Sequence, residues 1–211
     1  MIKAILWDND GVLLDTEILF FEVTRSAFLR LGLDLTEEIW GREYLGTGKG
    51  SRDIAISLGG DPDHVLSVMD ERNVLYSRIL EQPPTVRPLV CETLSALFGK
   101  VKMAIVTGSH REQFLTMHKS NGLLDFFDTI ITGDDYTHTK PHPEPYLTAM
   151  KVLDVSAERC IAVEDSPRGL ASALSAGIQC IIVPTRLTQM LEFPDALSIE
   201  QDVSGVLKYI D

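Results

Sequence analysis

Five short apolar runs recur along the chain, and polar or amphipathic stretches separate them. Each run is continuous rather than alternating and is rich in β-branched residues, which is typical of strands buried on both faces of a parallel sheet. Such strands with helices between them predict an α/β fold with a doubly wound, Rossmann-like sheet as its core. The runs cover residues 2–7, 101–107, 129–132, 160–163 and 180–183.

Cap and turn residues mark the helices between these runs. Ser166 followed by Pro167 is typical of an N-cap and a first helical position, and Gly177 is typical of a helix end. Two further helices are predicted, one from Pro143 to about Val152 and one that begins at Ser109 or His110 and ends at Gly122.

The segment between the first two runs has a different pattern. It contains no comparable apolar run, and its spacing predicts helices at 16–31, 51–58 and 63–80. Glycines and a proline at 59–62 separate the last two helices, and Pro83-Pro84 is typical of a hinge or linker. We therefore expect a helical insert over residues 15–84 within a core of residues 1–14 and 85–211.

Composition indicates an ordinary globular protein, with 45% apolar and 24% charged residues among 211. The net charge of -12 argues against general binding to nucleic acids or anionic membranes, because both require a basic face. Asp8 interrupts the N-terminal apolar run, and no run approaches the ~18 residues of a membrane span. We expect a soluble, cytoplasmic protein; its oligomeric state is left open, with a monomer among the allowed states.

The three cysteines, an odd number without paired spacing, agree with a reducing compartment. Cys160 and Cys180 begin apolar runs, where thiols behave as small core residues, and Cys91 has no partner at a characteristic spacing.

Two carboxylates directly follow the first apolar run. Asp8 and Asp10 are separated by one residue, and Gly11 allows a tight turn after them. On a strand, residues i and i+2 point to the same side, so the two carboxylates are expected to lie close together at the end of the strand. This crowding is unfavourable unless a cation or a shared proton relieves it. A solvated acidic turn is the alternative interpretation of this pair alone.

Other chemically active residues follow other predicted strands. The carboxyl ends of parallel strands meet at one edge, where ligands bind. Taken singly, each has an ordinary explanation, as a helix cap, a solvated lysine or acids at a helix start. Their convergence favours an active site instead. These residues are Thr107-Gly108-Ser109, Lys140 and Glu164-Asp165.

The motifs WDNDGVLLDTE, VTGS, TKPHPEPY and VEDSPRGLASALSAG occur in this order between residues 7 and 177. The set resembles the haloacid dehalogenase-like superfamily of hydrolases, in particular its β-phosphoglucomutase and small-phosphatase branch. The insert at 15–84 matches the helical cap domain of that branch in place and size. The resemblance implies a Mg²⁺-dependent phosphatase of small phosphorylated metabolites that acts through an aspartyl-phosphate.

The resemblance also implies a role for each residue at the edge of the sheet. Asp8 would be the nucleophile and a metal ligand, and Asp10 would exchange protons with the leaving group and the attacking water. Like charges repel by about 4 kcal/mol per pair at ~4 Å and an effective dielectric of ~20, so attack on a phosphate requires cations. Lys140 would be one of these cations. The Asp10 carbonyl and Asp165 would bind Mg²⁺, with Glu164 in an outer shell. Thr107, Gly108 and Ser109 would hold the phosphoryl oxygens.

One departure bears on the reaction. Phe20 stands where β-phosphoglucomutases carry a cap histidine, which favours simple hydrolysis over mutase activity. A phosphosugar mutase and a catalytically idle phosphate-binding regulatory protein stay open as alternatives.

Two further clusters carry charge or metal-binding groups. The glycine-rich loop at 46–52 holds Lys49 and Arg52, which are candidates to bind a second anionic group of the substrate, although a solvated loop explains them equally. His138 and His142 have a spacing compatible with a metal, but Lys140 and two prolines share that turn. A zinc site is therefore not expected there.

Overall fold

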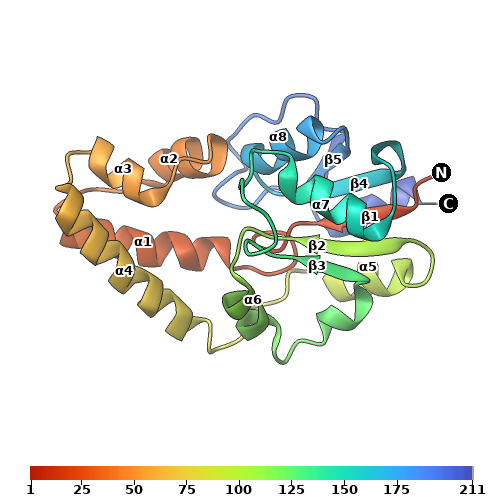
Figure 1. The fold of residues 1–211 in the computed structure, drawn as a ribbon, viewed down its shortest axis with the longest axis horizontal. Coiled ribbons are helices and arrows are strands. Elements are labelled where there is room, and N and C mark those ends of the chain that lie inside the picture. Colours follow the sequence, from red (N-terminus) through yellow and green to blue (C-terminus); the bar gives the residue numbers. More distant parts are fainter. Residues whose placement is uncertain (211) are drawn as a thin grey trace.

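The computed structural model describes residues 1–210 and contains one parallel sheet in the order β3-β2-β1-β4-β5-β6 (Figure 1). All five predicted strands are present, and the predicted α/β class is confirmed. The sixth strand, a two-residue edge strand, was not predicted because it is too short to give an apolar run. The strands are β1 (Ala4–Trp7), β2 (Lys102–Val106), β3 (Thr129–Ile131), β4 (Cys160–Glu164), β5 (Gln179–Ile182) and β6 (Ser198–Ile199).

The central strand β1 is buried on both faces. Ile5 and Trp7 belong to one apolar cluster and Ala4 and Leu6 to another, and all four side chains are inaccessible to solvent. This two-sided burial explains why the run is continuous instead of alternating. Trp7 pairs in register with Ile105 of β2 and with Val163 of β4, so the residues that follow these strands share one edge.

Helices cover both faces of the sheet. The cluster on one face includes residues of α5 and α6, and the cluster on the other includes residues of α7 and α8. As predicted, the Ser166 hydroxyl accepts a hydrogen bond from the N–H of Gly169 (3.3 Å), and Gly177 has a φ of +80° after the last turn. These helices are α5 (Val90–Leu97), α6 (Arg111–His118), α7 (Glu144–Leu153) and α8 (Pro167–Ser175).

Residues 15–84, which we name the cap segment, form helices only and lie together at one end of the molecule (Figure 1). Its three predicted helices are present. The turns at 37–46 were missed, because part of them is π-helical and lacks a 3.6-residue period. A separate apolar cluster that includes Phe28 and Trp40 stabilises the segment. Its helices are α1 (Glu17–Arg30), α2 (Glu37–Ile39), η1 (Trp40–Gly46), α3 (Ser51–Ser57) and α4 (Pro62–Ile79).

Two smaller observations complete the fold. Cys160 and Cys180 are buried and free, as expected of core thiols, and Cys91 is exposed. Among residues 1–210, none of the helices combines the length and the apolar character that a membrane span needs.

Candidate active site

A cavity of about 470 Å³ lies between the carboxyl edge of the sheet and the cap segment. The sheet side contributes residues from the loops after β1, β2, β3 and β4, as parallel strand topology requires. Thr107 and Asp165, at most 2% exposed, are buried among these loops. The predicted residues that line the cavity are Asp8, Asp10, Gly108, Ser109, Lys140 and Glu164.

Lys140 is the most heavily engaged cation in this site. Its ammonium donates to Asp8 Oδ1 (2.7 Å), to Glu164 Oε1 (2.6 Å) and to the carbonyl of Val106 (2.8 Å), and its side chain is 9% exposed. The hydroxyl of Tyr146 also donates to Glu164 Oε1 (2.6 Å). Glu164 therefore holds Lys140 beside Asp8, a positioning contact that the strand-end pattern did not specify.

Asp10 has different surroundings from Asp8. Its Oδ1 accepts a hydrogen bond from Thr16 (2.6 Å), and its Oδ2 accepts from Thr107 and Ser109 (3.0 Å each). Thr107 Oγ1 in turn accepts from the N–H of Ser109 (3.0 Å). Thr107 and Ser109 thus orient the second acid, in addition to the phosphate contacts expected of them.

Asp8, Glu164 and Asp165 form a buried acidic cluster whose carboxylate oxygens lie within 4.8 Å of one another. Asp165 Oδ2 is buried without a hydrogen-bond partner, and Gly11 faces this oxygen so closely that a Cβ there would collide with it. A buried carboxylate oxygen without a partner is unfavourable, and oxygen ligands suit a hard cation. The cluster therefore fits a metal ion. Glu164 Oε2, like Asp165 Oδ2, is buried without a partner, while Glu164 Oε1 and Asp8 Oδ1 accept from Lys140.

Burial and crowding change the acidity of these groups. Burial raises the pKa of Asp8, Lys140 lowers it, and the negative charges of Glu164 and Asp10 raise it again. Burial and the charge of Asp8 also raise the pKa of Asp165. Both carboxyls favour a proton in the absence of more positive charge, so a bound cation is needed to keep them ionised at neutral pH.

The cap segment supplies an aromatic wall. Phe20 lies 4.9 Å from Tyr76, between ring centres, and Tyr44 stacks on Trp40 at 3.9 Å and 16°. The indole N–H of Trp40 donates to Glu17 Oε1 (3.1 Å). Burial raises the pKa of Glu17 to about 7. Phe20 thus occupies the cavity with an apolar ring that cannot exchange protons.

Arg168 is a second cation of the cavity that the sequence patterns did not indicate. It is the second residue of α8, and its guanidinium carbon lies 4.4 Å from the centre of the Tyr44 ring. Its signal in the sequence is its place at a helix start directly after the strand-end acids.

Lys49 and Arg52 do not line the cavity, although Gly48 and Gly50 of the same loop do. The ammonium of Lys49 lies 3.3 Å from Glu43 Oε2 and 3.1 Å from the Ser57 hydroxyl. Arg52 is exposed. Their role in substrate binding stays a prediction.

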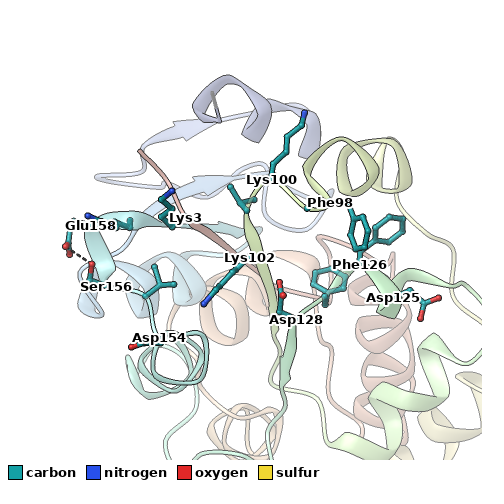
Figure 2. A pocket seen from close by; sticks show the side chains of 15 residues that line it. Lys3, Phe98, Lys100, Lys102, Asp125, Phe126, Asp128, Asp154, Ser156 and Glu158 are labelled. Carbon is teal, nitrogen blue, oxygen red and sulfur yellow. Dashed lines mark hydrogen bonds between the residues drawn. The ribbon is translucent and has the colours of Figure 1, made fainter.

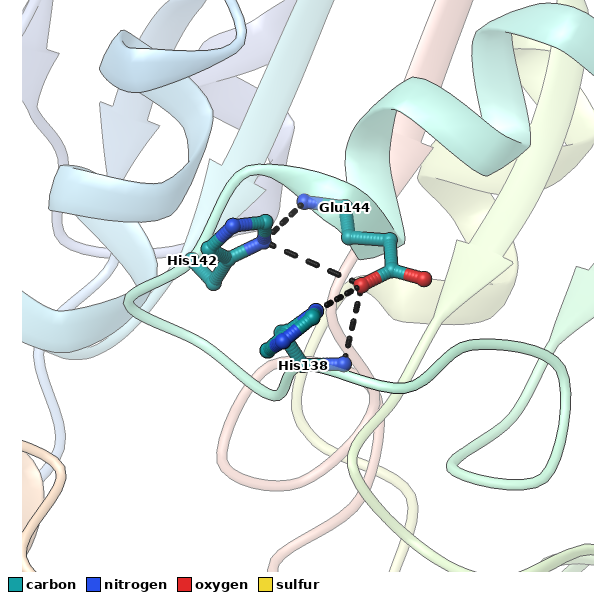
Figure 3. Close-up of side chains that lie close together, drawn as sticks. All are labelled: His138, His142 and Glu144. Carbon is teal, nitrogen blue, oxygen red and sulfur yellow. Dashed lines mark hydrogen bonds and ion pairs between the residues drawn. The ribbon is translucent and has the colours of Figure 1, made fainter.

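His138 and His142 meet Glu144 on the surface beside the Lys140 loop (Figure 3). His138 Nδ1 lies 2.7 Å from Glu144 Oε2, and His142 Nδ1 accepts from the N–H of Glu144 (3.2 Å). The N–H groups of Thr137 and His138 also donate to the Glu144 carboxylate (3.0 and 2.9 Å). Each converging atom has a protein partner, so the cluster joins this loop to the start of α7.

A second cavity, of about 760 Å³, opens at the amino edge of the sheet (Figure 2). Its charges are mixed: Lys3, Lys100 and Lys102 lie near Asp128 and Glu158. Lys102 is bound to the carbonyl of Leu153 (2.6 Å). None of the strand-end residues of the first cavity lies here, and the amino edge of a parallel sheet is not where ligands of this fold bind.

The chain is similar in sequence and in fold to several known proteins. The chain is 35% identical to YhcW of Bacillus subtilis over 199 residues, 92% of this chain and 89% of that protein. It is 32% identical to the phosphorylated carbohydrates phosphatase of Thermotoga maritima over 187 residues, 85% of this chain and 83% of that protein. A crystal structure of a CbbY variant from Rhodobacter sphaeroides with xylulose-(1,5)bisphosphate has a TM-score of 0.80 and 25% identity over 100% of both chains.

The family model described as haloacid dehalogenase-like hydrolase matches residues 5–183. This range contains every strand-end residue of the cavity and the whole cap segment. The chain therefore belongs to the haloacid dehalogenase-like hydrolases.

Proposed function

We propose that this hydrolase is a Mg²⁺-dependent phosphatase of small phosphorylated metabolites, phosphorylated sugars foremost, and that residues 15–84 are its cap domain. The observation that carries the proposal is the asymmetry of the two acids. Lys140 binds Asp8 at 2.7 Å, whereas three hydroxyl groups hold Asp10. One relative is named a phosphatase of phosphorylated carbohydrates, which supports this substrate class.

Asp8 is the nucleophile of the proposed reaction. A carboxylate oxygen of Asp8 attacks phosphorus, the bond from phosphorus to the leaving oxygen breaks, and Asp10 gives its proton to that oxygen. Asp10 then takes a proton from a water, whose oxygen attacks phosphorus. The bond from phosphorus to the Asp8 oxygen breaks, which releases inorganic phosphate and regenerates the Asp8 carboxylate. Lys140 neutralises part of the charge that builds up on the phosphoryl oxygens. A Mg²⁺ held by Asp8 and Asp165 would supply further positive charge at the same oxygens.

Phe20 supports hydrolysis over mutase chemistry. A mutase must return the phosphoryl group to a second substrate hydroxyl, whereas hydrolysis needs only water at Asp10. Phe20 packs against Tyr76 and offers no proton-exchanging group at the cap side of the cavity. A catalytically idle protein is the other alternative, and the intact set of Asp8, Asp10 and Lys140 argues against it.

The test is turnover of an aryl phosphate and of phosphorylated sugars by wild type, Asp8→Asn and Asp10→Asn. Asp8→Asn is expected to lose more than roughly 10³-fold in activity, because the amide is neither a nucleophile nor an anionic ligand. Asp10→Asn is expected to accumulate the aspartyl-phosphate, detected in acid-quenched peptides as one phosphoryl group on Asp8. Asp15→Asn, an exposed acid of the same motif, is the control. A tenth of wild-type activity in Asp8→Asn would rule out the covalent mechanism.

A further inference from the structure

Arg168 joins the core to the cap segment at the cavity. It extends from the first turn of α8, is half-buried, and lies against the ring of Tyr44 in η1. Tyr44 is itself stacked on Trp40. An arginine plane against an aromatic face is a favourable arrangement.

Among the described residues Arg168 forms no ion pair, although burial, which lowers its pKa, is outweighed by the nearby charges of Tyr44, Glu17 and Asp165, which raise it. Within residues 1–210, no carboxylate oxygen lies within the 4.0 Å that defines an ion pair with its guanidinium. Glu17 is near enough for Arg168 to lower the pKa of that acid, against a larger effect of burial that raises it. Glu17 Oε1 instead takes the N–H of Trp40. Arg168 is thus a partly buried cation that lines the cavity without an ion-paired carboxylate in the described part of the chain.

The other basic side chains at or near the cavity already have partners. Lys140 has three acceptors, two of them carboxylates. His110, exposed at the rim, lies 2.7 Å from Asp134. Lys49 is paired with Glu43, and its side chain does not line the cavity. Among the described residues that line the cavity, Arg168 is therefore the positively charged side chain without an ion-paired carboxylate.

The chemistry of this group favours an anionic partner with two oxygens. A guanidinium presents a planar fork of N–H donors that matches a carboxylate or a phosphate through two parallel hydrogen bonds. In the proposed mechanism the transferred phosphoryl group already has Lys140 and the acidic cluster as partners. A second anionic group of the same substrate could meet Arg168 without competing for those partners.

We propose that Arg168 is a specificity-determining residue that binds a second anionic group, a carboxylate or a phosphate, on the leaving part of the substrate. This inference rests on the proposed phosphatase function and deepens it by naming the substrate class. Tyr44 belongs to the cap segment and contacts Arg168, so an anion held at this place also bridges the two sides of the cavity.

The experiment compares substrates that differ only in the second anion. Phosphoglycolate is paired with ethyl phosphate to test a carboxylate, and xylulose bisphosphate with xylulose monophosphate to test a phosphate. For each pair, kcat/KM for the doubly anionic member is divided by kcat/KM for the other. Arg168→Gln is expected to lower this ratio by about ten- to a hundredfold, the loss of one charge-assisted hydrogen bond or more. The pair that shows the larger fall identifies the anion.

Two further variants make the result specific. Arg168→Lys keeps the charge but not the planar fork, so it is expected to restore only part of the ratio. Arg42→Gln removes an exposed guanidinium of η1 that pairs with Glu38, and it is expected to leave the ratio unchanged. An unchanged ratio in Arg168→Gln, an equal fall for both members of each pair, or a higher Mg²⁺ requirement would overturn the inference. If wild type hydrolyses none of the four substrates and no aryl phosphate, the proposed function itself fails.

Discussion

Replacement of Lys140 by methionine is the perturbation with the largest expected effect on both stability and activity. The methionine side chain fills nearly the same space but removes the ammonium between Asp8 and Glu164. The side chains of these two acids are 11% and 1% exposed, so water cannot replace the lost cation. Two crowded carboxylates then lack a counter-charge.

The expected loss of stability follows from the burial of the pair that Lys140 forms with Asp8 and Glu164. Removal of one partner from a buried ion pair costs about 3–5 kcal/mol, because the remaining charge stays desolvated. The variant can relieve part of this by taking up a proton. Burial raises the pKa of Asp8, and Lys140 opposes that rise, so its loss raises the pKa further. Each further unit is worth about 1.4 kcal/mol.

The sign of the pH dependence is determined by this shift. An acid whose pKa is raised by folding keeps a proton that the unfolded chain releases, so the folded state is favoured at low pH and loses this advantage as pH rises. Lys140→Met should therefore lose more stability at pH 8 than at pH 5. The free energy of unfolding is measured in urea with a chelator present, from the fluorescence of the buried Trp7 and Trp40.

Lys49→Met is the matched control. It removes an ammonium from a surface pair with Glu43 (3.3 Å), and such pairs contribute about 0–1 kcal/mol. Hydrolysis by Lys140→Met should also fall by at least about 10²–10³-fold, as expected when one preorganised positive group is lost. A stability cost below about 1 kcal/mol at both pH values, or a cost equal to that of Lys49→Met, would refute the electrostatic interpretation of this site.

Three further predictions concern the metal, the buried acid of the cap segment and the cap loop. Asp165→Ala should raise the Mg²⁺ concentration required for half-maximal activity, because it removes a buried oxygen without a protein partner. Full activity of wild type in excess chelator would contradict a metal site. Burial raises the pKa of Glu17 from 4.5 to about 7, so the free energy of unfolding of wild type should fall by up to about 3 kcal/mol as pH rises through that range. Glu17→Gln should remove this pH dependence, measured by urea unfolding, and the same pH dependence in the variant would contradict the prediction. Lys49→Ala should change kcat/KM for a phosphorylated sugar by about threefold or less, because Lys49 is held by Glu43 and Ser57. A tenfold loss for the phosphorylated sugar but not for an aryl phosphate would instead support a role in substrate binding.

The fold could be predicted because its elements have strong local signals. Buried parallel strands are continuous apolar runs, and Ser166 with Pro167 and Gly177 marks the two ends of α8. Elements without such signals were missed. The helix α5 was not predicted, and it begins after Leu89, a non-glycine residue at a φ of 61° that gives no recognisable cap. The two-residue β6 exists only through its pairing with β5.

The catalytic side of the cavity could also be predicted, because strand order alone brings the ends of β1, β2 and β4 together. The opposite side could not. The contact between Arg168 and Tyr44 joins residues 124 positions apart through the placement of η1 against α8, which no local period specifies. The support of Lys140 by Tyr146 and Glu164 has the same origin, since it depends on how α7 packs on the sheet.

The chemical division between the two acids has a structural cause. Asp8 continues the strand: its N–H donates to the carbonyl of Val163 (2.9 Å), and its side chain reaches Lys140 at the crowded centre of the edge. Asp10 lies just before a tight turn at Gly11, whose φ is +84°, and this turn carries its side chain toward hydroxyl donors instead of cations. A cation beside Asp8 favours the ionised form that a nucleophile needs, whereas the hydroxyl donors fix the orientation of the Asp10 carboxyl. Two identical residues two positions apart therefore have different partners, because β1 ends at Trp7 and the chain turns at Gly11 directly after Asp10.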